Sequence, residues 1–139
     1  MRTLLKAFLA GTALLGTVSV AFAVDGALTL YTSQPNNDAQ QTIDAFTAKY
    51  PDVKITFVRD GTTKIMAKLQ AELEAGSSPA DVLLIADSVT MEDLARDGKL
   101  MAYPEADVSA YDQAIQDPER MWFPTKLITT GIVYHTSAP

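Results

Sequence analysis

Small polar residues gather at three places in this chain, and each place directly follows a run of apolar residues. The candidate ligand-binding residues are Ser33, Gln34, Asn36, Gly61, Thr62, Thr63, Asp87 and Ser88. Each group stands where an amphipathic helical pattern begins. Hydroxyls, amides and free N–H groups at a helix N-terminus favour an anion. The pattern predicts an oxyanion cradle, although the same residue types are also the commonest helix N-caps.

Asp87 is the one acidic side chain among these residues. Its carboxylate could hold a cation, an amine or a metal ion, or it could cap the helix that follows. We name Asp87 as the metal-ligand candidate and assign no other metal ligand.

Several kinds of chemistry do not fit the residues present. Gly61 is not followed by the Gly-Lys-Ser or Gly-Lys-Thr of a phosphate-binding loop, and no paired-glycine dinucleotide motif occurs, so no nucleotide cofactor is expected. The chain has no cysteine for thiol catalysis and a single histidine, His135. Ser137 lies near His135 without a glycine elbow, so a hydrolase is a weak alternative and we expect no enzyme.

The composition is that of a small globular domain. The chain has 139 residues, of which 47% are hydrophobic and 20% are charged. Its formal charge of −6 argues against binding to nucleic acid or to an anionic membrane, since both need clustered Lys and Arg.

Residues 1–23 have the pattern of a secretory signal peptide. Arg2 and Lys6 precede a mostly apolar stretch, and Ala21-Phe22-Ala23 fits a small-residue cleavage site. A membrane anchor is the alternative, but the apolar stretch is short for a membrane span. We expect cleavage after Ala23 and a periplasmic location.

The rest of the chain alternates between two hydrophobic periods. Period-two or continuous apolar runs predict strands at 27–31, 53–57 and 82–86. Between and after them, apolar stripes predict three helices: Ala39, Ile43, Phe46 and Tyr50 before Pro51; Ile65, Met66, Leu69 and Leu73 before Gly76; and Met91, Leu94 and Ala95 before Gly98.

This βαβαβα order predicts an α/β fold with a doubly wound parallel sheet. The continuous apolar run at 82–86 favours a strand buried on both faces. In open parallel sheets, ligands bind beyond the carboxyl ends of the strands, and all three polar groups follow such ends.

The periodicity fades after Lys99. We expect Tyr103, Tyr111, Trp122 and Phe123 to pack the segment 99–124 onto the sheet. Residues 127–134 again have the composition of a strand.

Several motifs occur together in a familiar order. They are the segments 28–33, 46–51, 53–55, 61–72, 78–82 and 130–134. In sequence and spacing the chain resembles a periplasmic solute-binding protein of an ABC importer, and within that class it is similar to the ferric-iron-binding group, which has the type 2 periplasmic binding fold.

The resemblance implies two α/β lobes that close on a ligand. Residues 24–126 would then be the N-terminal lobe, and residues 127–139 would be the hinge strand that leads to a second lobe absent from this chain. The resemblance also implies an inner-membrane permease as partner, a small ligand, no nucleic acid and a monomer.

The cargo that the resemblance implies is iron(III), carried as a solute and not as a cofactor. The first-lobe histidine typical of iron binders falls at Pro35 or Asn36, and the glutamate falls at Ala86 or Asp87. The hydroxyls and amides suit an oxyanion better. That oxyanion could be a carbonate or phosphate bound beside iron, or it could be the cargo itself, a small organic anion such as a phosphonate or phosphate ester. A fragment without a function of its own is the remaining alternative.

Overall fold

The computed structural model describes residues 25–129 and 131–137. Within them, strands β1 (Gly26–Thr32), β2 (Val53–Arg59) and β3 (Val82–Leu84) form one parallel sheet in the order β2-β1-β3. Strand β1 is therefore central, and the chain crosses from one side of it to the other between β2 and β3.

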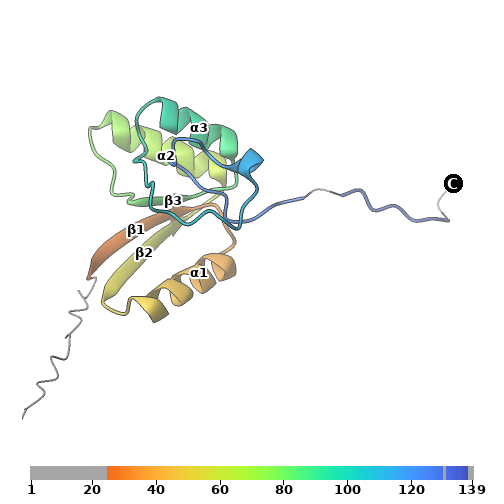
Figure 1. The fold of residues 1–139 in the computed structure, drawn as a ribbon, viewed down its shortest axis with the longest axis horizontal. Coiled ribbons are helices and arrows are strands. Elements are labelled where there is room, and N and C mark those ends of the chain that lie inside the picture. Colours follow the sequence, from red (N-terminus) through yellow and green to blue (C-terminus); the bar gives the residue numbers. More distant parts are fainter. Residues whose placement is uncertain (1–24, 130, 138–139) are drawn as a thin grey trace, which may run out of the picture.

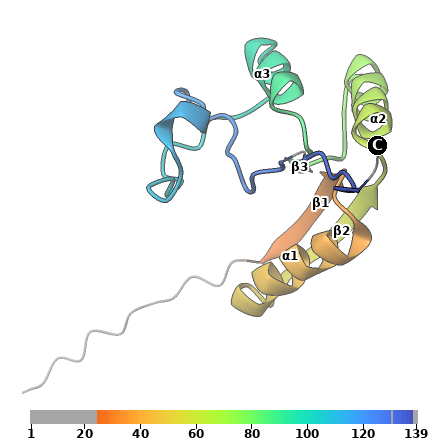
Figure 2. The same cartoon turned by 90° about the vertical axis from the view of Figure 1, so that its right-hand side faces the viewer.

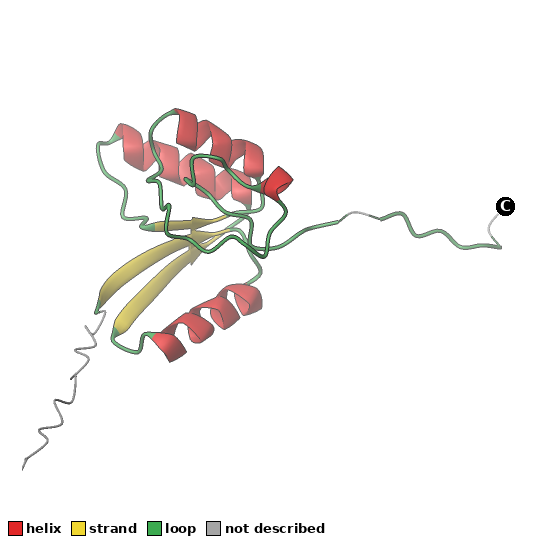
Figure 3. Cartoon of the chain, viewed as in Figure 1, coloured by secondary structure: helices red, strands yellow, loops and turns green. Residues whose placement is uncertain are grey.

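Helices cover both faces of this sheet. Helix α1 (Asn36–Lys49) packs on one face, whereas α2 (Thr62–Glu74) and α3 (Ser88–Arg96) lie on the other (Figures 1 and 3). Strands and helices alternate along the chain as the hydrophobic periods predict. The expected fold class, a doubly wound parallel α/β lobe, is confirmed.

The register aligns the carboxyl ends of all three strands. Strand β1 pairs with β2 from Gly26↔Val53 to Thr32↔Arg59, and its last residues pair with β3 up to Thr32↔Leu84. The loops that leave the three strands therefore start side by side at one edge of the sheet.

Glycine ends two of the helices. Gly76 follows α2 with φ of +96°, and Gly98 follows α3 with φ of +65°. These left-handed conformations favour residues without a Cβ, and they stop each helix at the place that the sequence predicts. Helix α1 ends at Lys49, just before Tyr50 and Pro51, because the residue before a proline avoids the helical region.

The hydrophobic core lies on both sides of β1. Its most buried apolar members are Leu30, Tyr31, Ala39, Ile43, Val53, Ile65, Leu69 and Val108. The predicted stripes on α1 and α2 supply four of these residues. Phe46 stays 37% exposed and stacks on Tyr50 at the end of α1, with ring centroids 4.9 Å apart.

The expectation for the third strand is wrong in one respect. Strand β3 has three residues, ends before Ile85, and leaves Val82 44% exposed. The reason is its position, because β3 pairs with β1 on one side and with no other strand in the part of the chain that the structure describes. A run of apolar residues predicts that a strand will be buried. It does not show whether a second neighbouring strand will pair with it.

The segment between α3 and residue 126 has little regular structure. Its short 3₁₀ helix, η1 (Gln113–Ile115), lies on the side of the sheet that carries α2 and α3 (Figure 2). The expected packing of its aromatic residues onto the sheet is largely wrong. Tyr103 is 54% exposed, and the partly buried Trp122 donates a hydrogen bond from Nε1 to Glu92 of α3 (3.1 Å).

The described residues after 126 differ from the rest of the lobe. The described residues of 127–137 form no strand and extend away from the sheet (Figure 1), so the strand expected at 127–134 is not formed. A strand needs a hydrogen-bonded partner, and this segment has none in the described chain. The predicted signal peptide lies outside the described residues. Among those residues, no helix has the length and hydrophobicity needed to cross a membrane.

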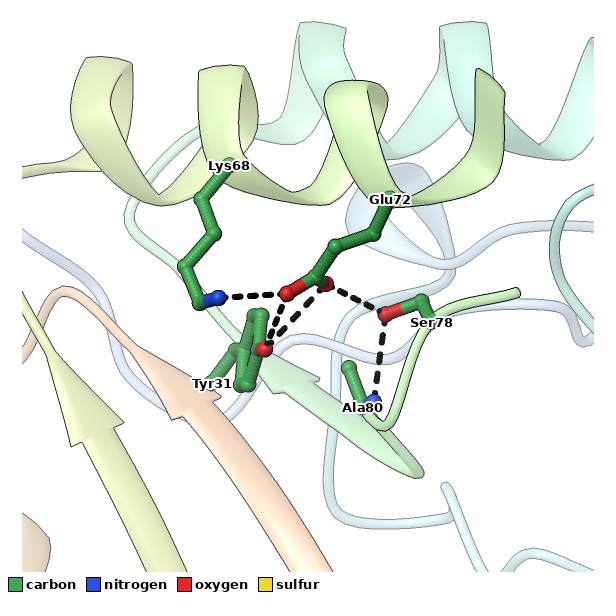
Figure 4. Close-up of polar contacts among 5 residues, drawn as sticks. All are labelled: Tyr31, Lys68, Glu72, Ser78 and Ala80. Carbon is green, nitrogen blue, oxygen red and sulfur yellow. Dashed lines mark hydrogen bonds and ion pairs between the residues drawn. The ribbon is translucent and has the colours of Figure 1, made fainter. Parts of the chain in front are cut away.

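A polar cluster lies within the lobe, between β1 and α2 (Figure 4). The Tyr31 side chain is buried, and its hydroxyl donates to Glu72 Oε1 (2.8 Å). Glu72 also accepts a hydrogen bond from Ser78 (2.8 Å) and pairs with Lys68. The Ser78 hydroxyl in turn accepts from the backbone N–H of Ala80 (3.1 Å). The cluster therefore ties β1 to α2 and to the loop that leads into β3.

These contacts stabilise the charged carboxylate. The hydrogen bond from Lys68, with smaller contributions from Ser78 and Tyr31, lowers the pKa of Glu72. Burial and the bond to Glu72 raise the pKa of Tyr31. A lowered folded-state pKa of Glu72 means that its stabilisation is complete above the unfolded value of about 4.3 and is lost as the pH falls through the folded value.

The substitution Tyr31→Phe removes one hydrogen bond and keeps the buried ring. We expect it to lower the free energy of unfolding by about 1 kcal/mol, and to make the loss of stability at acid pH shallower because Glu72 loses a donor. Urea unfolding followed by circular dichroism between pH 3 and 7 measures both effects. Tyr103→Phe, on an exposed ring, is the matched control, and an equal effect of the two substitutions would contradict the role of the cluster.

Candidate functional site

The loops after β1 and β2 meet through two hydrogen bonds. The Arg59 side chain donates from Nε to the backbone oxygen of Gln34 (2.9 Å). The backbone N–H of Asp60 donates to the oxygen of Thr32 (3.3 Å). These contacts hold the start of α1 beside the start of α2.

The loops after β1 and β3 meet at Ser33. Its backbone N–H donates to the oxygen of Leu84 (3.1 Å), and its hydroxyl accepts from the N–H of Ala86 (3.1 Å). The Ser33 side chain therefore has a structural role at the edge, in addition to its candidate role in ligand binding.

Thr32, the last residue of β1, makes further contacts to the same loops. Its side chain is fully buried; its hydroxyl donates to the oxygen of Leu84 (2.9 Å) and accepts from the N–H of Gln34 (3.1 Å). Donor and acceptor capacity are both used, so this threonine links the loops and is not available to a ligand.

Helices α1 and α2 begin without a side-chain cap. Their N-cap positions are Pro35 and Gly61, and no side chain accepts a hydrogen bond from the first turn of either helix. Asn36 and Thr63 are exposed in these first turns, and Thr62 is partly buried. The positive ends of two helix dipoles therefore face the edge beside free amide and hydroxyl groups, as an oxyanion cradle requires.

Gly61 needs no special backbone conformation. Its φ is −61°, and an added Cβ would meet no atom within 4 Å. Its N–H donates to the carboxylate of Asp60 (2.7 Å), which also faces Lys64 at 3.6 Å. Neither the backbone conformation nor the surroundings therefore require glycine at this position.

Asp87 is the N-cap of α3. Its carboxylate accepts from the N–H groups of Val89 (3.1 Å) and Thr90 (3.4 Å), and from the Thr90 hydroxyl. The hydrogen bond from the Thr90 hydroxyl is the main cause that lowers the pKa of Asp87, with help from the two backbone bonds and against partial burial. The capping alternative thus describes this side chain, whereas the exposed Ser88 caps nothing.

Two charged groups at this edge were not among the sequence candidates. Arg59 is the last residue of β2. It comes just after the strand predicted at 53–57, so its position could have identified it from the sequence. Lys126 pairs with Asp38 in the first turn of α1 (2.9 Å), across 88 positions of the chain. Lys126 lines a groove with Gln34, Asp38 and Leu84. No local pattern predicts a contact over that separation.

The structure therefore brings all three polar groups to one edge, but it gives them different surroundings. Asn36, Thr62 and Thr63 stand at uncapped helix starts, while Ser33 and Asp87 already hold the loop structure. Within the described residues, no group of three or more His, Cys, Asp or Glu side chains is placed to hold a metal ion.

In open parallel α/β sheets, ligands bind beyond the carboxyl ends of the strands, and this lobe has its polar loops at that edge. The fold is therefore typical of a ligand-binding lobe. A family model for bacterial extracellular solute-binding proteins matches residues 32–138, and the chain belongs to that family. Such proteins are the solute-binding components of ABC transporters, bind small ligands outside the cytoplasm and work with a membrane permease. A search of curated proteins finds no match.

The substitution Thr32→Val keeps the shape of the side chain and removes both of its hydrogen bonds. We expect a loss of about 1–3 kcal/mol in the free energy of unfolding, because Leu84 and Gln34 lose a buried partner. Chemical unfolding measures the loss. Thr56→Val, at an exposed position of β2, should change stability little, and equal stability of the two variants would refute the linking role of Thr32.

The capping role of Asp87 predicts a graded series. Asp87→Ala should cost about 1 kcal/mol of stability, whereas Asp87→Asn keeps an N-cap acceptor and should cost about half as much, through the lost charge at the helix start. The lowered pKa means that the charge stabilises the fold above the unfolded pKa and that this is lost on acidification. Thermal unfolding at pH 7 and pH 3 tests the series. Ser88→Ala serves as control, and an Asn variant as unstable as the Ala variant would argue against capping.

Proposed function

We propose that this chain contributes one face of a solute site and that the solute carries an oxyanion, such as a phosphonate or a phosphate ester. The observation that carries this proposal is the pair of uncapped helix starts, α1 and α2, beside Asn36, Thr62 and Thr63. Hydrogen-bond donors and two positive dipole ends favour negative oxygen atoms.

Iron(III) is the second candidate cargo, and the resemblance to ferric-iron-binding proteins is what favours it. Ferric iron prefers anionic oxygen ligands. In this lobe the best-placed carboxylate, Asp87, is engaged by the start of α3. Iron would therefore need most of its ligands from elsewhere, with an oxyanion at α1 and α2 completing its coordination.

The proposed role in transport rests on the family and on the sequence of residues 1–23. We infer that residues 1–23 direct export and are removed, which places the lobe in the periplasm. The loaded protein would deliver its solute to an inner-membrane permease, and the hydrogen bonds at the edge would be the means of capture.

Calorimetric titration tests the cargo. We expect methylphosphonate or inorganic phosphate to bind, and we expect the double substitution of Thr62 and Thr63 by valine to weaken binding about tenfold or more through two lost hydrogen bonds. Thr47→Val is the matched control, because the Thr47 hydroxyl bonds to the oxygen of Ile43 within α1 (3.0 Å), near the far end of the helix.

The alternative cargo gives a different result. If iron(III) binds without any oxyanion and Asp87→Asn abolishes that binding, the oxyanion proposal is wrong and Asp87 is a metal ligand. If the double valine variant binds phosphate as well as the unchanged chain does, the helix starts are not the solute site.

A further inference from the structure

Helices α1 and α3 each have an aspartate near the start, but the two carboxylates have different partners. Asp87 accepts hydrogen bonds from the backbone N–H groups of Val89 and Thr90 at the start of α3. Asp38 lies in the first turn of α1, and no side chain caps that helix. The carboxylate of Asp38 instead accepts a hydrogen bond from Lys126 Nζ (2.9 Å). The N–H groups at the start of α1 are therefore left without the capping carboxylate that α3 has.

The ion pair of Asp38 and Lys126 lies beside the proposed solute site. The two residues are 88 positions apart in the chain, and both side chains are partly exposed. They line a groove together with Gln34 and Leu84, which belong to the loop after β1 and to the end of β3. An exposed ion pair adds little to stability. Its larger consequence here is the charge that it sets at the start of α1.

A carboxylate in the first turn of a helix opposes the binding of an oxyanion in two ways. It repels the anion, and it competes for the N–H groups that the anion needs. The ammonium group of Lys126 offsets the charge of Asp38 and holds its carboxylate in the groove. With the pair formed, the start of α1 offers hydrogen-bond donors and a positive dipole end without a net negative charge.

We propose that Lys126 is a positioning residue of the solute site, which pairs with Asp38 and so keeps the start of α1 open to an oxyanion. This role rests on the proposed function and extends it, because it identifies the contact that sets the charge of the site. Lys126 acts through Asp38 and does not need to touch the solute.

Calorimetric titration with inorganic phosphate tests this role in the full chain and in three variants. Lys126→Met should weaken binding about two- to fivefold, because Asp38 then stands unpaired beside the anion. Asp38→Asn should tighten binding by a similar factor, since Lys126 keeps its charge. The double variant should bind like the unchanged chain, because the local charge is again zero.

Two further variants control for net charge. Lys49→Met removes the same positive charge in the last turn of α1, where Lys49 lies over the ring of Tyr50 (5.3 Å). Asp44→Asn removes a negative charge at an exposed position further along α1. Both should leave the phosphate affinity unchanged. Added salt should reduce the differences among the first three variants, since it screens exposed charges, and thermal unfolding shows that each variant is folded.

The double variant decides between two roles for Lys126. Restored binding supports its action through Asp38. Binding as weak as that of Lys126→Met alone would show that the lysine contacts the solute directly, and it would overturn the proposal.

The remaining outcomes separate this role from the proposed function. If valine at positions 62 and 63 weakens phosphate binding and all three charge variants leave it unchanged, the role of Lys126 is refuted and the solute site stands. If no phosphate binds, or if the two valines leave binding unchanged, the proposed function is wrong and the role of Lys126 is refuted with it.

Discussion

The arrangement of the loops at the carboxyl end of the sheet depends on the buried side chain of Thr32. It stands at the end of the central strand, where β1 pairs with Arg59 on one side and Leu84 on the other. Its hydroxyl holds the turn at Gln34 and the end of β3, while its backbone oxygen receives the N–H of Asp60. One residue thus contacts all three loops, because it ends β1, the central strand of the sheet.

The starts of the three helices at this edge differ in how their N–H groups are capped. The start of α3 already has an anion, the carboxylate of Asp87. No side chain caps the starts of α1 and α2, although Asp38 lies in the first turn of α1, paired with Lys126, and Asp60 directly precedes the start of α2. An oxyanion, as proposed for the solute, would find uncapped N–H groups at the starts of α1 and α2 and a carboxylate already in place at the start of α3. The partly buried contacts of Glu72 lie between β1 and α2 and take no part in capping these helix starts.

Exposed apolar side chains of the lobe include residues at the outer edge of β3 and in the segment after Lys126. The core around β1 is well covered by α1 and α2, yet the outer edge of β3 and the segment after Lys126 expose large aliphatic side chains. The hydrophobic effect makes such exposure unfavourable. Leu84, which ends β3, lines a groove together with Thr125 and Lys126, the residues just before that exposed segment.

The sequence by itself determined the order of strands and helices, the ends of the helices at Pro51, Gly76 and Gly98, and the arrival of three polar groups at one sheet edge. These features follow from short-range periodicity and from backbone preferences that each residue carries with it. Only the tertiary structure decided that Asp87 serves as a cap, that Lys126 reaches Asp38, and that, among the described residues, β3 is a partly exposed edge strand and 127–129 and 131–134 form no strand. Each of these depends on which distant segments become neighbours, and pairing over such separations is set by the packing of the whole lobe, which no local pattern encodes.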